Sequence, residues 1–299
     1  MGSSGALARN YSGGMEDTLA IAVAQFAPTG DAEANLETIT ELAERASRRG
    51  ARILVAPEYS SFFEKEIGPA YLDGAQPLDG PFVQGLGRLA ARLGLFVVAG
   101  LVETRSATHF SNTLVALAPS GELVATYRKL HLYDAFGGNE SDWIVPGEID
   151  EPETFTVDGF TVGLQTCYDV RFPEVTRMLV DAGAEIVLIP SEWVRGPLKE
   201  HHWRTLVTAR ALENTIYVAA ADHVPPVGVG NSMVVDPSGV EIATIGDEVG
   251  IAVAEVSRAR LEAVRTVNPA LTLRRFHVAA GAPTVSADGA QARETVESL

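Results

Sequence analysis

Gly50-Ala-Arg-Ile-Leu-Val-Ala-Pro57-Glu58 in the first half of the chain returns in the second half as Gly183-Ala-Glu-Ile-Val-Leu-Ile-Pro190-Ser-Glu192. A second pair of stretches, residues 111–122 and 230–241, repeats in the same order. Each of these has Asn as its second residue and a Pro-Ser-Gly turn later on. The chain therefore contains an internal duplication, and we expect two halves of similar fold.

Each half alternates short apolar runs with amphipathic segments, which predicts strands alternating with helices. Continuous apolar runs are typical of strands that are buried on both faces. Strands are expected at residues 19–26, 53–56, 95–101, 112–118, 122–127, 160–167, 186–189, 216–221, 230–235, 240–245 and 250–256, and helices at residues 35–49, 81–93, 174–182, 197–214 and 257–264. Two such halves predict an α/β fold with two sheets packed face to face, each covered by its own helices. The expected architecture is a four-layer α-β-β-α sandwich.

The 299 residues, 46% of them hydrophobic, are enough for one large core. We expect a single domain over residues 19–265. Residues 1–18 are rich in Gly and Ser, and we expect them to form a disordered leader. Residues 266–299 lack a clear pattern, and we interpret them as a C-terminal tail associated with a dimer.

Composition excludes several classes of protein. No apolar run approaches the ~18 residues of a membrane helix, and the N-terminus lacks the basic and apolar regions of a secretory signal. With one cysteine the chain forms no internal disulfide, so we expect a cytoplasmic protein. A formal charge of −16 argues against nucleic acid or an anionic membrane as partner. The negative charge of the protein would repel an anionic substrate at long range, so binding one would require arginines close to the site.

Three chemically useful residues follow predicted strands: Glu58, Lys129 and Cys167. Each has an ordinary interpretation, since most free cysteines are small buried hydrophobes and charged residues at strand ends are usually solvated or paired. Together they fit nucleophilic catalysis. Cys167 would be a nucleophile exposed at a strand end that turns into a helix, where N–H groups and a nearby ammonium lower the thiol pKa. Glu58, with a raised pKa, would take the thiol proton.

Three stretches resemble the signatures of the carbon–nitrogen hydrolase (nitrilase) superfamily. They are residues 56–59 (Ala-Pro-Glu-Tyr), 127–134 (Tyr-Arg-Lys-Leu-His-Leu-Tyr-Asp) and 165–174 (Gln-Thr-Cys-Tyr-Asp-Val-Arg-Phe-Pro-Glu). Residues 203–214 also look like the helix that follows the family's catalytic strand pair. The resemblance covers about residues 19–256 in the right order and implies the same α-β-β-α sandwich.

The resemblance implies a catalytic triad of Glu58 as general base, Lys129 as oxyanion stabiliser and Cys167 as nucleophile. Lys129 would share the oxyanion with the backbone N–H of Tyr168. Family members often use a second glutamate in the loop after the lysine. Glu140 matches it best, and Glu148 is the alternative.

The implied reaction is two-step acyl transfer, in which an amide gives ammonia and a cysteine thioester that water then hydrolyses. The cysteine signature looks most like that of small-acid amidases, including ω-amidases and deaminated glutathione amidases. The alternatives are an N-carbamoyl or nitrile hydrolase of the same fold, or a non-catalytic binding or scaffold member. The resemblance implies no metal or organic cofactor, and it implies a homodimer or higher homo-oligomer.

Five further residues are candidates for the substrate pocket. We expect Trp193, Tyr133 and Phe63 to line it, although ordinary core packing is the alternative for Trp193. If the substrate carries a carboxylate, Arg195 or Arg171 could bind it through a bidentate pair. For Arg171, a structural ion pair with a neighbouring acid is the alternative.

The histidines offer two competing interpretations. His131 or His223 could pair with Cys167 in a Cys–His hydrolase, but His131 belongs to the lysine signature, and we expect it to fix that loop by hydrogen bonds. His201 and His202 are adjacent on a predicted helix, where side chains diverge by roughly 100° and no third ligand stands out. They therefore do not predict a metal site.

Overall fold

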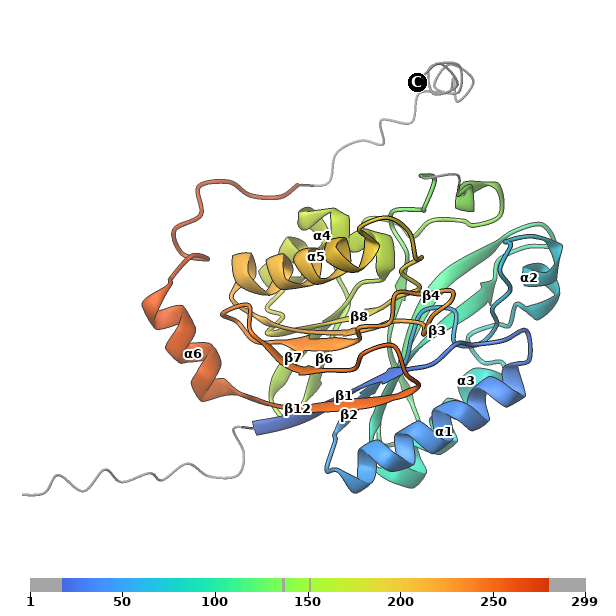
Figure 1. Cartoon of the computed structure of the whole chain (residues 1–299), viewed down its shortest axis with the longest axis horizontal. Coiled ribbons are helices and arrows are strands. Elements are labelled where there is room, and N and C mark those ends of the chain that lie inside the picture. The colour runs from blue at the N-terminus through green and yellow to red at the C-terminus, as the bar shows by residue number, and fades with distance from the viewer. Residues whose placement is uncertain (1–17, 136–137, 151, 280–299) are drawn as a thin grey trace, which may run out of the picture.

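The computed structural model describes residues 18–135, 138–150 and 152–279 (Figure 1). The strands are β1 (Thr18–Gln25), β2 (Ile53–Val55), β3 (Phe96–Thr104), β4 (Phe110–Leu117), β5 (Leu123–Arg128), β6 (Thr154–Val157), β7 (Phe160–Leu164), β8 (Ile186–Pro190), β9 (Tyr217–Ala221), β10 (Met233–Val235), β11 (Glu241–Thr244) and β12 (Gly250–Ser257). The helices are α1 (Ala32–Arg48), α2 (Pro69–Gly74), α3 (Pro81–Leu93), α4 (Pro173–Asp181), α5 (Lys199–Asn214) and α6 (Arg258–Val267), with the short 3₁₀ helices η1 (Glu140–Asp142) and η2 (Cys167–Arg171).

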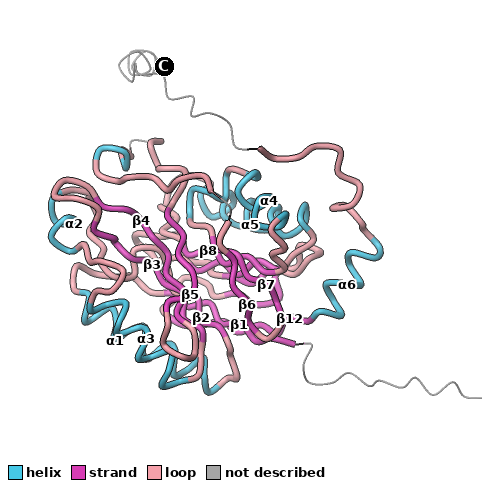
Figure 2. Tube along the Cα trace, turned by 180° about the vertical axis from the view of Figure 1, so that it is seen from behind, coloured by secondary structure: helices cyan, strands magenta, loops and turns pink. Residues whose placement is uncertain are grey.

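The described strands form two six-stranded sheets, in the orders β12-β1-β2-β3-β4-β5 and β11-β10-β9-β8-β7-β6. Helices α4 and α5 cover the outer face of the second sheet, and α1 and α3 cover the outer face of the first (Figures 1 and 2). The predicted four-layer α-β-β-α sandwich of two similar halves is therefore confirmed.

The continuous apolar runs arise because the central strands are buried on both faces. In β2, Ile53 and Val55 pack into the core between the sheets, while Leu54 packs under the helices. In β8, Leu188 faces the core between the sheets and Val187 faces the helices. Each such side chain contributes roughly 1.5–3 kcal/mol when it is fully buried. A polar residue in either run would therefore oppose folding.

Two strands extend the sheets beyond the repeated unit. The last strand, β12, crosses back to the first sheet and pairs antiparallel with β1 over its whole length, from Thr18 opposite Ser257 to Gln25 opposite Gly250. Strand β6, which is absent from the predicted strands, pairs antiparallel with β7. The crossing of β12 ties the second half of the chain to the first.

The predicted strand over residues 160–167 is too long. Strand β7 ends at Leu164, and Cys167 begins η2 with a left-handed φ of 45°. The chain leaves the sheet after Leu164, because residues 167–171 form η2 and lead directly into α4.

Both predicted domain boundaries fall inside elements of the structure. Thr18, assigned to the leader, is the first residue of β1, and Thr266, assigned to the tail, lies in α6. Residues 1–17 and 280–299, which hold the rest of the predicted leader and much of the predicted tail, lie outside the described residues. Among the helices that the structure does describe, none is long and apolar enough to cross a membrane.

Candidate active site

Glu58 lies just beyond the end of β2, in a turn that depends on a glycine of the neighbouring strand. Its side chain is fully buried. The next residue, Tyr59, has a left-handed φ of 56°. A Cβ atom on Gly100 of β3 would lie 2.3 Å from the Tyr59 nitrogen, so a side chain there would collide with this turn. Gly100 thus allows the Glu58 backbone to pass directly over β3.

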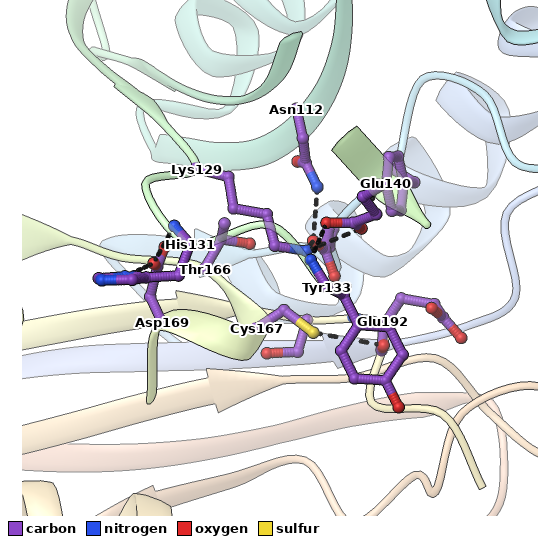
Figure 3. A network of polar contacts seen from close by, with 12 residues as sticks. Asn112, Lys129, His131, Tyr133, Glu140, Thr166, Cys167, Asp169 and Glu192 are labelled. Atoms are coloured by element: carbon purple, nitrogen blue, oxygen red, sulfur yellow. Dashed lines mark hydrogen bonds and ion pairs between the residues drawn. The ribbon is translucent and has the colours of Figure 1, made fainter. Parts of the chain in front are cut away.

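Lys129 follows β5, and its ammonium lies between two carboxylates (Figure 3). The Lys129 N–H donates to the Asn112 carbonyl at 2.9 Å, which continues the pairing of β5 with β4. Its side chain is only 1% exposed, and Nζ donates to Glu58 Oε1 at 3.0 Å and to Glu140 Oε1 at 2.9 Å. Three charges from different parts of the chain are therefore held together away from water.

Glu140, rather than Glu148, contacts the lysine. Its Oε1 also accepts the Tyr59 hydroxyl at 2.9 Å, and its Oε2 accepts the Tyr133 N–H at 2.7 Å. Glu148 is exposed and lines a separate pocket between β5 and α4. The loop that carries Glu140 is thus anchored at both carboxylate oxygens.

Glu58 is held by neutral donors as well as by Lys129. The Asn112 side-chain amide donates to Oε1 at 2.6 Å, and the Glu192 N–H donates to Oε2 at 2.7 Å. The His223 imidazole is 2.7 Å from the Glu58 carbonyl oxygen through Nε2. Burial lowers the pKa of His223 to about 4, so the ring is neutral at pH 7 and donates this hydrogen bond. The carboxylate therefore has little freedom to turn.

Cys167 lies at the mouth of the same cluster, 7% exposed. Its Sγ donates to the Glu192 carbonyl oxygen at 3.3 Å (Figure 3). Glu192 thereby binds the thiol through its carbonyl and Glu58 through its N–H. One peptide segment, directly after β8, fixes both groups.

The charge states follow from burial and from the neighbouring charges. Burial raises the pKa of Glu58, although Lys129 opposes the rise. Burial alone would lower the pKa of Lys129, but Glu140 and Glu58 outweigh it and raise that pKa well above its usual value. The ammonium therefore stays charged across the neutral range, and Glu58 is a stronger base than an exposed carboxylate.

The expectation of a thiol with a lowered pKa is wrong. Burial raises the pKa of Cys167 well above its usual value, Glu58 adds to the rise, and Lys129 opposes it without reversing it. The resting cysteine is a neutral thiol. Its activation therefore requires a base rather than a preformed thiolate.

A cavity of about 20 Å³ joins these groups. Its lining residues are Glu58, Lys129, Tyr133, Glu140, Cys167, Tyr168, Glu192, Trp193, Val194 and Lys199. A space of this size holds about one water molecule. A chamber of about 780 Å³ adjoins it and shares Tyr133, Glu140, Glu192 and Val194. The inner cavity can thus take a reacting group while the outer chamber leads to it.

The five predicted pocket residues lie at the inner cavity, in the outer chamber and beside the Trp193 ring. Trp193 and Tyr133 line the inner cavity, and Tyr133 also lines the outer chamber. Phe63 and Arg195 line the outer chamber alone. Arg195 is exposed, and its Nε lies 3.8 Å from Glu200. The Arg171 guanidinium lies 4.9 Å from the centre of the Trp193 ring, beside the inner cavity.

The histidines are engaged elsewhere. His131 contacts Asp169 through Nδ1 at 2.8 Å and through its N–H at 2.9 Å, so it ties the lysine loop to the cysteine turn as expected. His223 binds the Glu58 backbone rather than the thiol. Within the ranges that the structure describes, no group of three or more His, Cys, Asp or Glu is arranged to hold a metal ion, and this includes His201 and His202.

Sequence reasoning missed four residues that build the site: Glu192, Asn112, Asp222 and Lys199. The duplication already pointed to Glu192, because a glutamate follows Pro190 after one serine as Glu58 directly follows Pro57. Asp222 accepts the Trp193 N–H at 2.7 Å and the Val229 N–H at 2.9 Å, and so holds the segment after β8. Nothing in the local sequence of Asp222 indicates these contacts, which join separate loops.

Comparison with known proteins shows which family the chain resembles in sequence and in structure. A model of the carbon–nitrogen hydrolase family matches residues 20–266. The deaminated glutathione amidase of Escherichia coli O157:H7 is 39% identical over 86% of this chain and 97% of its own length, and the human enzyme of that name is 35% identical over 85% and 82%. A solved amidase from Nesterenkonia, with the acetamide moiety of fluoroacetamide on its active-site cysteine, matches with a TM-score of 0.72 and 29% identity over 88% of this chain and 95% of its own.

Proposed function

Because this chain belongs to the carbon–nitrogen hydrolase family, we propose that it is an amidase, which converts a small linear amide and water to a carboxylate and ammonia. The observation that carries the proposal is the buried Lys129 ammonium, bound by Glu58 and Glu140 in a cavity that also opens to the single cysteine. A scaffold protein would gain nothing from this arrangement, since buried ion pairs cost about as much in desolvation as they return.

In the first step, Glu58 takes the proton of the Cys167 thiol as Sγ attacks the amide carbonyl carbon. A C–S bond forms, and the carbonyl π electrons move to the oxygen. Lys129 and the backbone N–H of Tyr168 stabilise that oxyanion. When the oxyanion collapses, the C–N bond breaks, and the nitrogen leaves as ammonia with the proton that Glu58 held.

In the second step, Glu58 takes a proton from a water molecule, which attacks the thioester carbon. The C–S bond then breaks, the thiolate recovers a proton from Glu58, and the acid leaves. The inner cavity, with room for about one water, is suited to this step. Glu140 holds the Lys129 ammonium in place through both steps and keeps its charge.

For the substrate we propose an ω-amide or an amide resembling deaminated glutathione, with Trp193, Tyr133 and Phe63 lining its path and Arg171 or Arg195 binding a carboxylate. The similarity to two deaminated glutathione amidases supports this class. The outer chamber, lined in part by Phe63 and Arg195, has room for an acyl chain beyond the reacting amide.

We also propose a cytoplasmic homodimer. The single cysteine fits a reducing compartment, because exported domains commonly rely on disulfides. After α6 the chain exposes Leu273 and Phe276, 70% and 88% accessible, which favours a partner surface near the C-terminal tail. Light scattering at several protein concentrations tests this, since a mass of one chain throughout would contradict it.

Ammonia release from a panel of short amides, carbamoyl compounds and nitriles tests the activity. We expect release from amides by the native protein and none by Cys167→Ala, whose circular dichroism should match the native spectrum. Release from carbamoyl compounds or nitriles alone would replace the amidase by the corresponding alternative. Release from none of them, with a thiol no more reactive than free cysteine, would favour a scaffold.

A further inference from the structure

One buried carboxylate, that of Asp169, joins the lysine segment (residues 127–133) to the cysteine turn (residues 167–172) (Figure 3). Asp169 lies in η2, two residues after the nucleophile, and its side chain is fully buried. Its Oδ2 accepts the Tyr127 hydroxyl at 2.7 Å. Its Oδ1 accepts the His131 backbone N–H at 2.9 Å and contacts the His131 Nδ1 at 2.8 Å. The same carboxylate therefore holds the residues two positions before and two positions after the catalytic lysine.

Ring contacts between the same two segments reinforce this link. The ring of Phe172, which follows η2, stacks on the His131 imidazole, with the ring centres 3.6 Å apart and the planes 5° apart. The Tyr168 ring meets the Tyr133 ring edge-on, with the centres 5.1 Å apart. The lysine segment and the cysteine turn are therefore in contact through several side chains as well as through the carboxylate.

Burial makes the carboxylate dependent on the lysine segment. A buried carboxylate costs several kcal/mol unless hydrogen bonds replace its water. Within the part of the chain that the structure describes, the side-chain oxygens of Asp169 accept from Tyr127 and His131. The Tyr127 hydroxyl keeps the proton that it donates, because burial and the Asp169 charge raise its pKa well above the usual value. Displacing the lysine segment would thus leave a buried charge without its donors.

The proposed mechanism needs the two segments at a fixed separation. Lys129 supplies one oxyanion donor from the lysine segment, and the Tyr168 N–H supplies the other from the cysteine turn. Over the described residues no hydrogen bond joins Lys129 to Cys167, since the ammonium binds two carboxylates and the thiol binds a backbone carbonyl. The separation of the donors therefore depends on contacts between the segments. A misplacement of about 1 Å can cost on the order of 10²-fold in rate.

We propose that Asp169 is a positioning residue, which holds Lys129 and the Tyr168 N–H at the separation that stabilises the oxyanion. The proposal rests on the amidase function given above and assigns Asp169 no contact with the substrate. The hydrogen bonds of Asp169, rather than its charge, have this effect. In Asp169→Asn the remaining oxygen can accept both His131 contacts, and the NH₂ group can donate to the Tyr127 hydroxyl. This variant should therefore keep most of the native rate.

Reversible addition of an aldehyde tests the oxyanion site without turnover. Butyraldehyde forms a C–S bond with the single cysteine, and the thiol proton ends on the former carbonyl oxygen, which occupies the oxyanion site. Its affinity is measured as protection of the thiol against iodoacetamide, whose own reaction forms no oxyanion. In Tyr127→Phe, which removes one hydrogen bond to Asp169, the affinity should fall about 10-fold. The rate of alkylation without aldehyde, taken at the fully ionised thiol, should change little.

The matched control is Tyr217→Phe. Tyr217 begins β9, is buried, and donates its hydroxyl to the Ser257 carbonyl at 3.2 Å. Its loss should cost a similar amount of stability but leave both the aldehyde affinity and the alkylation rate unchanged. If Tyr127→Phe behaves like this control, or if its alkylation rate falls as much as its aldehyde affinity, the positioning role is overturned.

Ammonia release gives the second readout. Asp169→Ala should lower kcat at least ~10²-fold with little change in KM, and Asp169→Asn should keep most of the rate. An equal loss in Asp169→Asn and Asp169→Ala would overturn the proposal, because the charge would then matter rather than the hydrogen bonds. If Asp169→Ala does not fold, the comparison of Tyr127→Phe with Tyr217→Phe decides alone.

The two readouts separate the positioning role from the amidase function. Amide hydrolysis by the native protein with an unchanged kcat in folded Tyr127→Phe and Asp169→Ala would leave an amidase and remove the role of Asp169. A weaker aldehyde affinity in Tyr127→Phe, with no ammonia released from any amide by the native protein, would support that role and contradict the amidase function. A native thiol that butyraldehyde does not protect would overturn the proposal.

Discussion

Replacing Glu58 by Gln keeps the size of the side chain and removes its negative charge and one of its two acceptor oxygens. In the native protein Oε1 accepts from Asn112 and Lys129, and Oε2 accepts from the Glu192 N–H. A glutamine offers one acceptor oxygen and one NH₂ group, so in either orientation its NH₂ group faces a donor. We expect a loss of roughly 1–3 kcal/mol in the free energy of unfolding, the penalty of one buried unsatisfied donor.

The effect on the rate should be much larger than the effect on stability. A positioned general base contributes typically 10²–10⁴-fold, so ammonia release should fall at least ~10²-fold. Although the rate falls, the Cys167 thiol should ionise more easily in this variant. Glu58 is one of the groups, after burial, that raise the pKa of Cys167, so its neutralisation should lower that pKa. If the variant has a more easily ionised thiol and still reacts more slowly, the loss of rate comes from the missing base and not from a lack of thiolate.

The assay has two parts: ammonia release under saturating amide, and the pH profile of iodoacetamide alkylation followed by intact mass. We expect a lower rate of ammonia release together with an alkylation profile moved to lower pH. Near-normal turnover by a folded Glu58→Gln protein would refute the assignment of Glu58 as the base. A profile moved to higher pH would refute the electrostatic argument.

Three further substitutions test the surroundings of the site. Lys129→Met should lower the rate at least ~10²-fold and cost about 3–5 kcal/mol in the free energy of unfolding, measured by urea titration, because it leaves two buried carboxylates without their cation. Glu140→Gln keeps the size of the side chain but weakens the hold on Lys129, so kcat should fall while Cys167 still alkylates; an unchanged kcat would contradict a positioning role. The pKa of His223 is lowered from 6.5 to about 4, so native stability is full above pH 6.5 and falls by about 3 kcal/mol as the pH drops to 4. His223→Gln keeps a donor for the Glu58 carbonyl and should lack this loss of stability between pH 6.5 and 4. If the free energies of unfolding of the two proteins fall in parallel with pH, the assignment to His223 is contradicted.

The sequence predicted the layers because those depend on a repeated pattern. The match between residues 50–58 and 183–192 implied two equivalent sheets, and parallel strands buried on both faces left little choice of packing. Glu58 could be found because it follows an apolar run that ends at Pro57, and Lys129 because it lies in the Tyr-Arg-Lys-Leu-His stretch after a predicted strand. The return of β12 to the first sheet could not be found this way, since its apolar pattern would suit the edge of either sheet.

The chemical state of the site was less accessible to sequence reasoning. The low thiol pKa expected for Cys167 was inferred from a nearby lysine and a helix start, and burial outweighs both. Lys199 went unnoticed because a lysine at the beginning of an amphipathic helix usually faces water. Only the fold shows that the chain before α5 turns it toward Trp193.

The mass of the intact protein after acid quenching during turnover of an amide shows directly whether a cysteine thioester forms. We expect a species heavier than the free chain by the acyl group, carried on Cys167 and absent from Cys167→Ala. A native protein that releases ammonia with no such adduct under any quench time, or one that carries the acyl group on another residue, would contradict a cysteine thioester.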